Sequence, residues 1–234
     1  MSDPAAHPVS ASDLSVIRRR MPGDDRKRQL LRIAIESFAQ KGFSGTKTKD
    51  IAAAAGVSEA ILFRHFATKE DLYHAILDIK ETREGTKQRL RELEELAGRR
   101  DDEALFRRLA REVVHSFRED AAFHRLLLYA GLDGHLLANL FRERFGLPTG
   151  DFLKRYIALR QKEGAFRKCD PRIAVMHFFG GVVQYAMSRY LFGVREHHLP
   201  EETVVDEFVE LVLSGLAKRD SRHDNRKAAH AKNS

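Results

Sequence analysis

The segment at residues 47–66, KTKDIAAAAGVSEAILFRHF, predicts two short helices joined by a tight turn. Gly56 marks the turn because glycine adopts the left-handed backbone conformation that a tight turn demands, and Ser58 is a residue type that caps helix N-termini. Ile51 on the first helix faces Leu62 on the second. This arrangement is typical of a helix-turn-helix, whose second helix enters the major groove of DNA.

An ordinary pair of helices in a bundle would show the same helix–glycine–helix pattern. The residues around the turn favour DNA, because hydroxyls, cations and helix N-termini are the groups that hold phosphates. Short and aromatic side chains on the second helix can also meet base edges and thymine methyls. We therefore predict DNA contacts from Thr46, Lys47, Thr48, Ser58, Ala60, Phe63, Arg64, His65 and Lys69.

A wider stretch, residues 28–77, resembles without a gap the N-terminal domain of TetR-type transcriptional regulators. The resemblance rests on IleAla…SerPhe…LysGlyPhe in the first helix, IleAla…AlaGlyValSer at 51–58, LeuPheArgHisPhe at 62–66 and LysGluAspLeu at 69–72. Phe63 and His65 stand where the family often has tyrosine. The resemblance therefore carries the DNA-binding role but no base specificity.

The resemblance implies a homodimer that binds a pseudo-palindromic, double-stranded DNA operator through the two recognition helices, residues 58–66 of each copy. It also implies a small-molecule effector that binds among the middle helices and releases a repressor from the operator. Effector and DNA would then weaken each other's binding equally, by linkage. The effector, the operator sequence and the sign of regulation are left open by the sequence.

Composition agrees with a globular, nucleic-acid-binding protein. The 234 residues carry 41 Lys and Arg against 34 Asp and Glu, a net charge of +7, which favours a polyanion as partner. The single cysteine, Cys169, excludes a disulfide framework and a Cys-rich zinc site. The first twenty residues have no apolar core of a signal peptide, and the most apolar stretch, 174–187, is too short for a bilayer span. We expect a cytoplasmic protein without a membrane partner.

The pattern of apolar residues predicts an all-α fold of about nine helices, because no run alternates as a half-buried strand does. The expected helices cover 24–40, 48–55, 58–66, a segment that begins at 68, 102–118, 121–144, 149–162, 171–194 and 200–217. The expected domains are a disordered tail at 1–22, a helix-turn-helix DNA-binding domain at 24–84, a helical ligand-binding and dimerisation domain at 85–217, and a disordered basic tail at 218–234.

The expected helices at 171–194 and 200–217 are apolar on two sides, so both sides need burial. Their own domain can cover one side, and a second copy of the chain can cover the other. The alternative is a pair of central helices in a large monomeric core. We predict a four-helix dimer interface that includes Ile173, Met176, Gly180, Val183, Met187, Phe208, Leu211 and Val212.

A ligand cavity among the middle helices is implied by the family resemblance alone. Several aromatic and aliphatic residues on these helices could line it, although plain core packing explains each of them individually. The predicted lining is Phe106, Phe123, Leu127, Tyr156 and Phe178.

Enzymatic alternatives have little support in the sequence. Glu112 and His115 form one Glu-x-x-His pair, whereas carboxylate di-iron bundles need two such pairs and two more glutamates. No Gly-rich phosphate loop and no Gly-x-Ser-x-Gly motif occurs. We predict no catalytic residues, no metal and no cofactor. A helical enzyme of the di-iron or small-ligand type and a helical interaction bundle remain as alternatives.

Overall fold

The computed structural model describes residues 23–80, 83–134, 136–194 and 199–218. Within these residues it has eleven α-helices, one short π-helical segment and no β-strand, which confirms the predicted all-α fold. The predicted tails, 1–22 and 218–234, lie outside the described residues except for Lys218. Their disorder stays a prediction.

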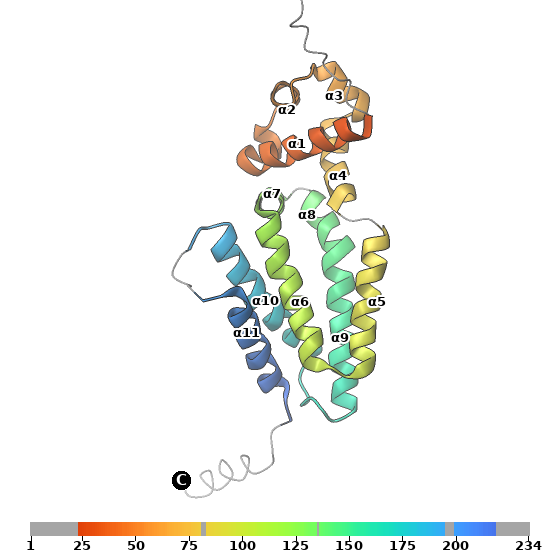
Figure 1. Cartoon of the computed structure of the whole chain (residues 1–234), viewed down its shortest axis with the longest axis vertical. Coiled ribbons are helices and arrows are strands. Elements are labelled where there is room, and N and C mark those ends of the chain that lie inside the picture. Colours follow the sequence, from red (N-terminus) through yellow and green to blue (C-terminus); the bar gives the residue numbers. More distant parts are fainter. Residues whose placement is uncertain (1–22, 81–82, 135, 195–198, 219–234) are drawn as a thin grey trace, which may run out of the picture.

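Four helices form a small unit at one end of the molecule, drawn in red to yellow in Figure 1. They are α1 (Gly23–Gly45), α2 (Thr48–Ala54), α3 (Glu59–His65) and α4 (Lys69–Lys80). Their apolar faces meet in one core, which buries Leu30, Leu31, Phe38, Ile51, Leu62, Leu72 and Ile76. This packing stabilises α2 and α3, which are too short to form alone in water.

The turn between α2 and α3 has the predicted backbone. Gly56 has a φ of +66°, in the left-handed region that favours glycine. Ser58 has the extended backbone of an N-cap residue, but its side chain makes no capping hydrogen bond. Instead, the hydroxyl of Thr48 donates to Oε1 of Glu59 at 2.5 Å, which joins the first turns of the two helices.

The end of α1 and the start of α4 are also set by residues that commonly stop or cap helices. Gly42 has a φ of +69° and interrupts α1 two residues after the predicted end of the first helix at residue 40. Thr68 and Asp71 form a capping box at the predicted start of the helix: each backbone N–H donates to the other side chain, at 3.1 and 3.0 Å. The bend between α3 and α4 is thereby fixed.

The remaining helices form a larger bundle, whose long members run roughly along the long axis of the molecule (Figure 1). They are α5 (Arg83–Arg99), α6 (Asp102–Glu119), α7 (Ala121–Leu132), α8 (Leu136–Phe141), the π-helical segment Arg142–Gly146, α9 (Leu147–Lys162), α10 (Pro171–Tyr190) and α11 (Glu201–Leu216). α10 and α11 pack on each other, and both pack on α6. The bundle core buries Leu105, Phe106, Leu109, Leu153, Ile157, Phe178, Val182, Val205 and Val209.

Two differences raise the number of helices above the predicted nine. α5 is absent from the prediction because its sequence is dominated by charge, and Leu93 is the one side chain among its described residues that is fully buried. The predicted helix 121–144 is divided at Gly134, whose φ of +66° separates α7 from α8.

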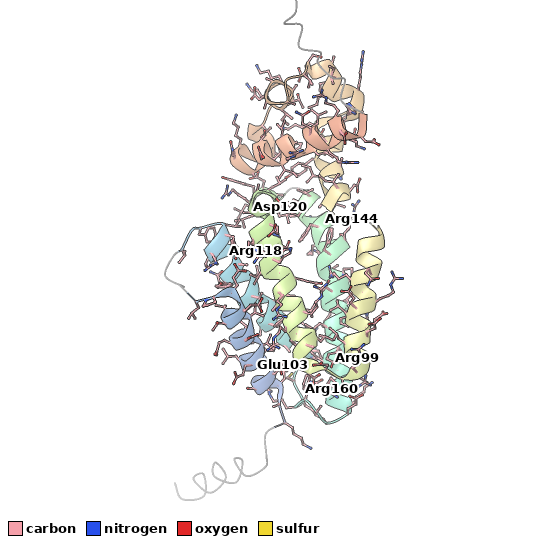
Figure 2. The ribbon with its side chains drawn as sticks, viewed as in Figure 1. Arg99, Glu103, Arg118, Asp120, Arg144 and Arg160 are labelled. Atoms are coloured by element: carbon pink, nitrogen blue, oxygen red, sulfur yellow. The ribbon has the colours of Figure 1, made fainter. Side chains whose placement is uncertain are left out.

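α7 connects the two parts of the molecule, because it packs along α1. Phe123, Leu126 and Ala130 of α7 belong to the same apolar core as the N-terminal helices. A second connection is polar: Nη1 of Arg144, which lies in the π-helical segment and is labelled in Figure 2, is 2.7 Å from Oδ1 of Asp78 in α4. The N-terminal unit therefore rests on α7 and on the π-helical segment.

Candidate nucleic-acid interface and internal cavity

One face of α3 lies outside the core. Glu59, Ala60, Phe63 and Arg64 are exposed, whereas Leu62 is buried against the other helices. Phe63 keeps 43% of its surface accessible, although an aromatic ring normally contributes to a core. A ring and a guanidinium exposed beside a small alanine form a surface that can meet base edges, thymine methyls and phosphates.

The predicted DNA contacts at α2 and α3 differ in their exposure. Lys47 and Ser58, together with the α3 residues just named, are exposed around the turn. Lys49 is exposed as well and was not predicted. Thr48 is half-buried and bound to Glu59. His65 is half-buried beside the ring of Phe66, with 6.4 Å between the ring centroids.

The structure does not support the predicted DNA contact of Thr46. It is only 2% exposed, and its hydroxyl donates to the carbonyl oxygens of Gly42 at 2.8 Å and Ser37 at 3.2 Å. The Gly42 carbonyl lies where α1 is interrupted, so the hydroxyl binds the backbone at the point where the regular helix ends. Thr46 therefore holds the end of α1, and its hydroxyl is not available to a phosphate.

The predicted DNA contact of Lys69 is not supported either. Its Nζ donates to the backbone carbonyl of Phe43 and lies 4.1 Å from the centroid of the Phe43 ring. Burial lowers the pKa of the Lys69 ammonium, and Glu70 opposes that shift in part. The side chain therefore ties α4 to the end of α1, and we assign it no phosphate contact.

A cavity of about 1070 Å³ that opens to solvent lies in the larger bundle, with walls mainly from α5 to α10. Most of its lining is apolar and includes Val113, Phe117, Phe141, Phe145, Val175 and Phe179. Phe123 and Leu127 of the predicted lining do face it. A cavity of this size and composition is large enough for a small organic molecule.

The other predicted pocket residues lie elsewhere. The rings of Phe106 and Phe178 pack edge to face, with 5.0 Å between centroids, and both are completely or almost completely buried in the bundle core. The hydroxyl of Tyr156 donates to Oδ1 of Asp102 at 2.6 Å, and burial together with this bond raises the pKa of Tyr156. The prediction that these three residues line the cavity is therefore wrong, and all three belong to the bundle core.

Three polar residues of the cavity wall meet at one place. Nη2 of Arg89 donates to the hydroxyl of Thr149, and Nε of Arg89 lies 3.4 Å from Oε2 of Glu112. Oε1 of Glu112 lies 3.1 Å from Arg108. Burial raises the pKa of the Glu112 carboxyl, while the two arginines lower it. None of these residues was predicted to line a cavity.

A second polar pair lies on the same wall, where α6 meets α7. The hydroxyl of Ser116 and Nε2 of His124 are 2.8 Å apart, and the His124 ring stacks on Phe117 with 3.7 Å between centroids. The three residues come from helices that are nearly adjacent in the chain. Sequence periodicity alone gives no sign that this pair reaches a cavity.

The Glu-x-x-His pair does not form a metal site. Glu112 lines the cavity, whereas His115 is exposed and its Nδ1 accepts a hydrogen bond from Nη2 of Arg118 at 2.9 Å. Among the described residues, no three His, Cys, Asp or Glu side chains gather as metal ligands would. A search of the same residues also finds no helix with the length and apolar character that a bilayer crossing requires.

The outer face of α10 and α11 exposes apolar side chains. Ile173 is 58% exposed, and Met176 and Leu211 are each 65% exposed. Ile173 and Leu211 line a groove of about 470 Å³, whereas Met176 also lies at the edge of the large cavity. Gly180 has open space where a Cβ would lie. These four residues fit the predicted dimer face.

The other predicted interface residues have contacts inside the subunit. Val212 is buried and is corrected to a core position. Phe208 packs on Gly181, where a Cβ would come within 3.0 Å of the ring. Val183 and Met187 line the cavity. The two-sided apolar pattern thus serves three surfaces: the core, the cavity and the outer face.

Residues 30–76 match the sequence model of the bacterial regulatory proteins of the tetR family. The transcriptional activator FasR of Mycolicibacterium smegmatis is 43% identical over 58 residues, which are 25% of this chain and 26% of FasR. The transcriptional repressor KstR2 of Rhodococcus jostii is 27% identical over 208 residues, which are 84% of this chain and 96% of KstR2. The chain thus spans about a quarter of the first relative and nearly all of the second.

The fold is shared with a solved regulator. The crystal structure of AibR in complex with isovaleryl coenzyme A and operator DNA has a TM-score of 0.60 and 21% sequence identity. The match covers 80% of this chain and 97% of AibR. Because this similarity extends beyond the N-terminal unit, it includes the helical bundle as well.

Proposed function

We propose that this TetR-type regulator is a homodimeric repressor, which leaves a pseudo-palindromic operator when a small molecule enters the bundle cavity. The observation that carries the proposal is the exposed face of α3, with Phe63 and Arg64 outside the core. A protein with this role acts on chromosomal DNA, so we place it in the cytoplasm.

DNA binding is supported by the chemistry around α3. Phe63 can contact a thymine methyl or a sugar, and the small Ala60 lets the helix approach the bases closely. Lys47, Lys49 and Arg64 add positive charge around the same turn, and cations there can hold phosphates on both sides of the groove. α3 therefore reads bases while α2 and the turn fix its position.

Coupling between effector and DNA is supported by residues that belong to both sites. Phe123 and Leu127 of α7 line the cavity, and they also pack with the core of the N-terminal helices. Phe141 has the same double position. A ligand that moves these side chains also moves the surface on which α1 rests. The effector then weakens DNA binding, provided that it prefers the arrangement that DNA does not.

Repression, rather than activation, is supported by KstR2, which is named a repressor and matches this chain over most of its length. FasR, named an activator, matches only about 58 residues. The AibR structure contains both operator DNA and isovaleryl coenzyme A. A protein of this fold can therefore bind DNA and a small molecule in the same complex. Homodimerisation is supported by the exposed apolar face of α10 and α11.

Selection of binding sites from random DNA with the purified protein tests the proposal. We expect an inverted repeat whose half-sites lie about one helical turn, or a multiple of it, apart, because the two α3 helices must face the same side of the duplex. Binding of one dimer per site should then be measured by fluorescence anisotropy. Enrichment of no common sequence, or of a single half-site, would contradict it.

A further inference from the structure

Arg89 is a cation in the wall of an otherwise mostly apolar cavity. An arginine carries five N–H donors and no acceptor. Nη2 of Arg89 donates to Thr149, but its Nε is buried and has no hydrogen-bond acceptor among the described residues. Oε2 of Glu112, at 3.4 Å, is close enough for charge attraction but not placed for a hydrogen bond. A buried donor without an acceptor is costly, so the Nε–H of Arg89 can gain an acceptor from a ligand.

Glu112 can release Arg89 without losing all of its compensating charge. Its other oxygen lies 3.1 Å from Arg108, which also lies 2.9 Å from Glu92. The Glu112 carboxyl is held in a site where burial already raises its pKa. An acidic ligand group that approaches Arg89 would therefore replace a poorly aligned partner, and Glu112 would keep Arg108.

Thr149 holds the guanidinium in place. Its hydroxyl donates to the carbonyl of Phe145 at 2.9 Å and accepts from Nη2 of Arg89. Thr149 is almost completely buried, at 8% exposed. The direction of the guanidinium is thus set by the protein before any ligand arrives, and this lowers the entropy cost of binding an anion.

The other carboxylates in the wall have donors of their own. Oε1 of Glu119 lies 3.2 Å from Arg118, and Asp120 accepts from the backbone N–H of Phe123 at 3.1 Å. A cationic ligand would have to displace these partners. The whole cavity, of about 1070 Å³, is at the upper end of the roughly 300–1,000 Å³ usual for small-molecule sites, and most of its lining is apolar. It has room for a long chain or a fused ring system.

We propose that the effector is an amphipathic monocarboxylate, whose carboxylate binds the Arg89 guanidinium and whose apolar body lies among Phe117, Phe141, Phe145 and Phe179. The inference rests on the proposed role of the cavity as the effector site. Arg89 is the binding residue, Thr149 positions it, and Glu112 is the group that the ligand carboxylate replaces.

Titration calorimetry with dodecanoate, methyl dodecanoate and dodecyltrimethylammonium, each below its micelle concentration, tests the ligand class. We expect dodecanoate to bind at least about tenfold more tightly than the ester, because hydrogen bonds to charged groups contribute more than neutral ones. Arg89→Gln should abolish this preference, and Glu112→Gln should strengthen dodecanoate binding. Arg99→Gln, on the same helix but outside the cavity lining, is the matched control and should change neither.

Two further variants keep the outcome interpretable if Arg89→Gln fails to fold, which circular dichroism will reveal. Arg89→Lys retains the charge but loses the planar donor pair, and Thr149→Val frees the guanidinium. Both should weaken dodecanoate binding while binding of the ester stays unchanged. Equal binding of acid and ester, tightest binding of the cation, or no binding of any probe would overturn the assignment.

Release of operator DNA, measured in parallel by anisotropy, separates this inference from the proposed function. If the ester releases DNA and dodecanoate does not, the ligand class is wrong and the cavity still acts as the effector site. If dodecanoate binds through Arg89 and the operator stays bound, the ligand class stands and the proposed release mechanism is wrong.

Discussion

The ammonium of Lys69 lies 4.1 Å from the ring centroid of Phe43 and donates a hydrogen bond to the carbonyl of the same residue. The Phe43 ring also packs at 4.9 Å from Tyr73, so the contact joins the start of α4 to the end of α1 and to the core. Lys69, although it lies next to the recognition helix in the sequence, thus stabilises the packing of α4 on α1. Whether Lys69 stabilises the fold or contacts DNA can be tested by measuring the free energy of unfolding and the salt dependence of operator affinity.

We expect Lys69→Ala to lower the free energy of unfolding by about 1–2 kcal/mol, because a cation–π contact and a hydrogen bond are lost. The dependence of operator affinity on salt should keep its slope. In contrast, Lys47→Ala should reduce that slope by about one while stability stays unchanged. Urea unfolding and anisotropy titrations over a salt series give both quantities. A reduced salt slope for Lys69→Ala would restore it as a phosphate contact.

Phe63 and Phe66 lie three residues apart and should respond in opposite ways to truncation. Phe63 is 43% exposed and Phe66 is 3% exposed. Phe63→Ala should change which operator sequences are preferred and leave the unfolding free energy within about 0.5 kcal/mol of wild type. Phe66→Ala should destabilise the domain by about 3–5 kcal/mol. Competition among variant operators and thermal unfolding measure the two effects; an unchanged ranking for Phe63→Ala would make it a packing residue.

The pKa of Asp170 predicts how the stability of the fold depends on pH. Hydrogen bonds from the Arg172 side chain and backbone, the backbone one at 2.8 Å, lower the pKa of Asp170 to about 2. Since this pKa lies below that of the unfolded chain, the carboxylate stabilises the fold fully above the unfolded pKa of about 3.9 and progressively less as the pH falls toward 2. Asp170→Asn keeps the cap of α10 but not the charge.

The asparagine variant should therefore be less stable than wild type near neutral pH, and the difference should shrink as the pH falls below about 4. Urea unfolding of both proteins at a series of pH values measures it. Arg172→Gln should reduce this pH dependence, because the carboxylate loses the side-chain hydrogen bonds and keeps only the one from the backbone N–H. A difference between wild type and Asp170→Asn that stays constant across this range would contradict the assignment.

The helix-turn-helix could be predicted because its signals are local. Gly56 and the Thr68–Asp71 capping box specify the backbone within a few residues, whatever the rest of the chain does. The roles of Thr46 and Lys69 could not, because both depend on where the end of α1 lies in space. A hydroxyl or an ammonium near a recognition helix looks the same in the sequence whether it faces DNA or a neighbouring carbonyl.

The cavity was harder to predict than the fold. Arg89, Glu112 and Thr149 come from three different helices, and no spacing in the chain relates them. Aromatic residues such as Phe106 have the same periodicity as the residues that do line the cavity. Whether such a ring fills a core or faces a void depends on how the helices are displaced from each other, which periodicity does not record.

The final prediction concerns the outer face of α10 and α11. Ile173, Met176 and Leu211 leave most of their surface in water in the single subunit, and a stable homodimer should cover them. Such an interface should bury more than about 1,000 Å² in total. Leu211→Glu and Gly180→Glu place a charge in its apolar centre and should separate the subunits.

Sedimentation should show a wild-type dimer at micromolar concentration and monomers for Leu211→Glu and Gly180→Glu, with helicity retained because neither position is packed inside the subunit. Leu159→Glu, which changes a partly exposed leucine on α9, is the matched control and should stay dimeric. Operator affinity should fall steeply for the monomers, since one α3 makes only half of the contacts. Gly181 is a poor choice for this test because its Cβ would meet Phe208 within the same subunit. Dimers that survive both glutamate variants would place the interface on another face, and a monomeric wild type that binds an inverted repeat tightly would contradict the dimer altogether.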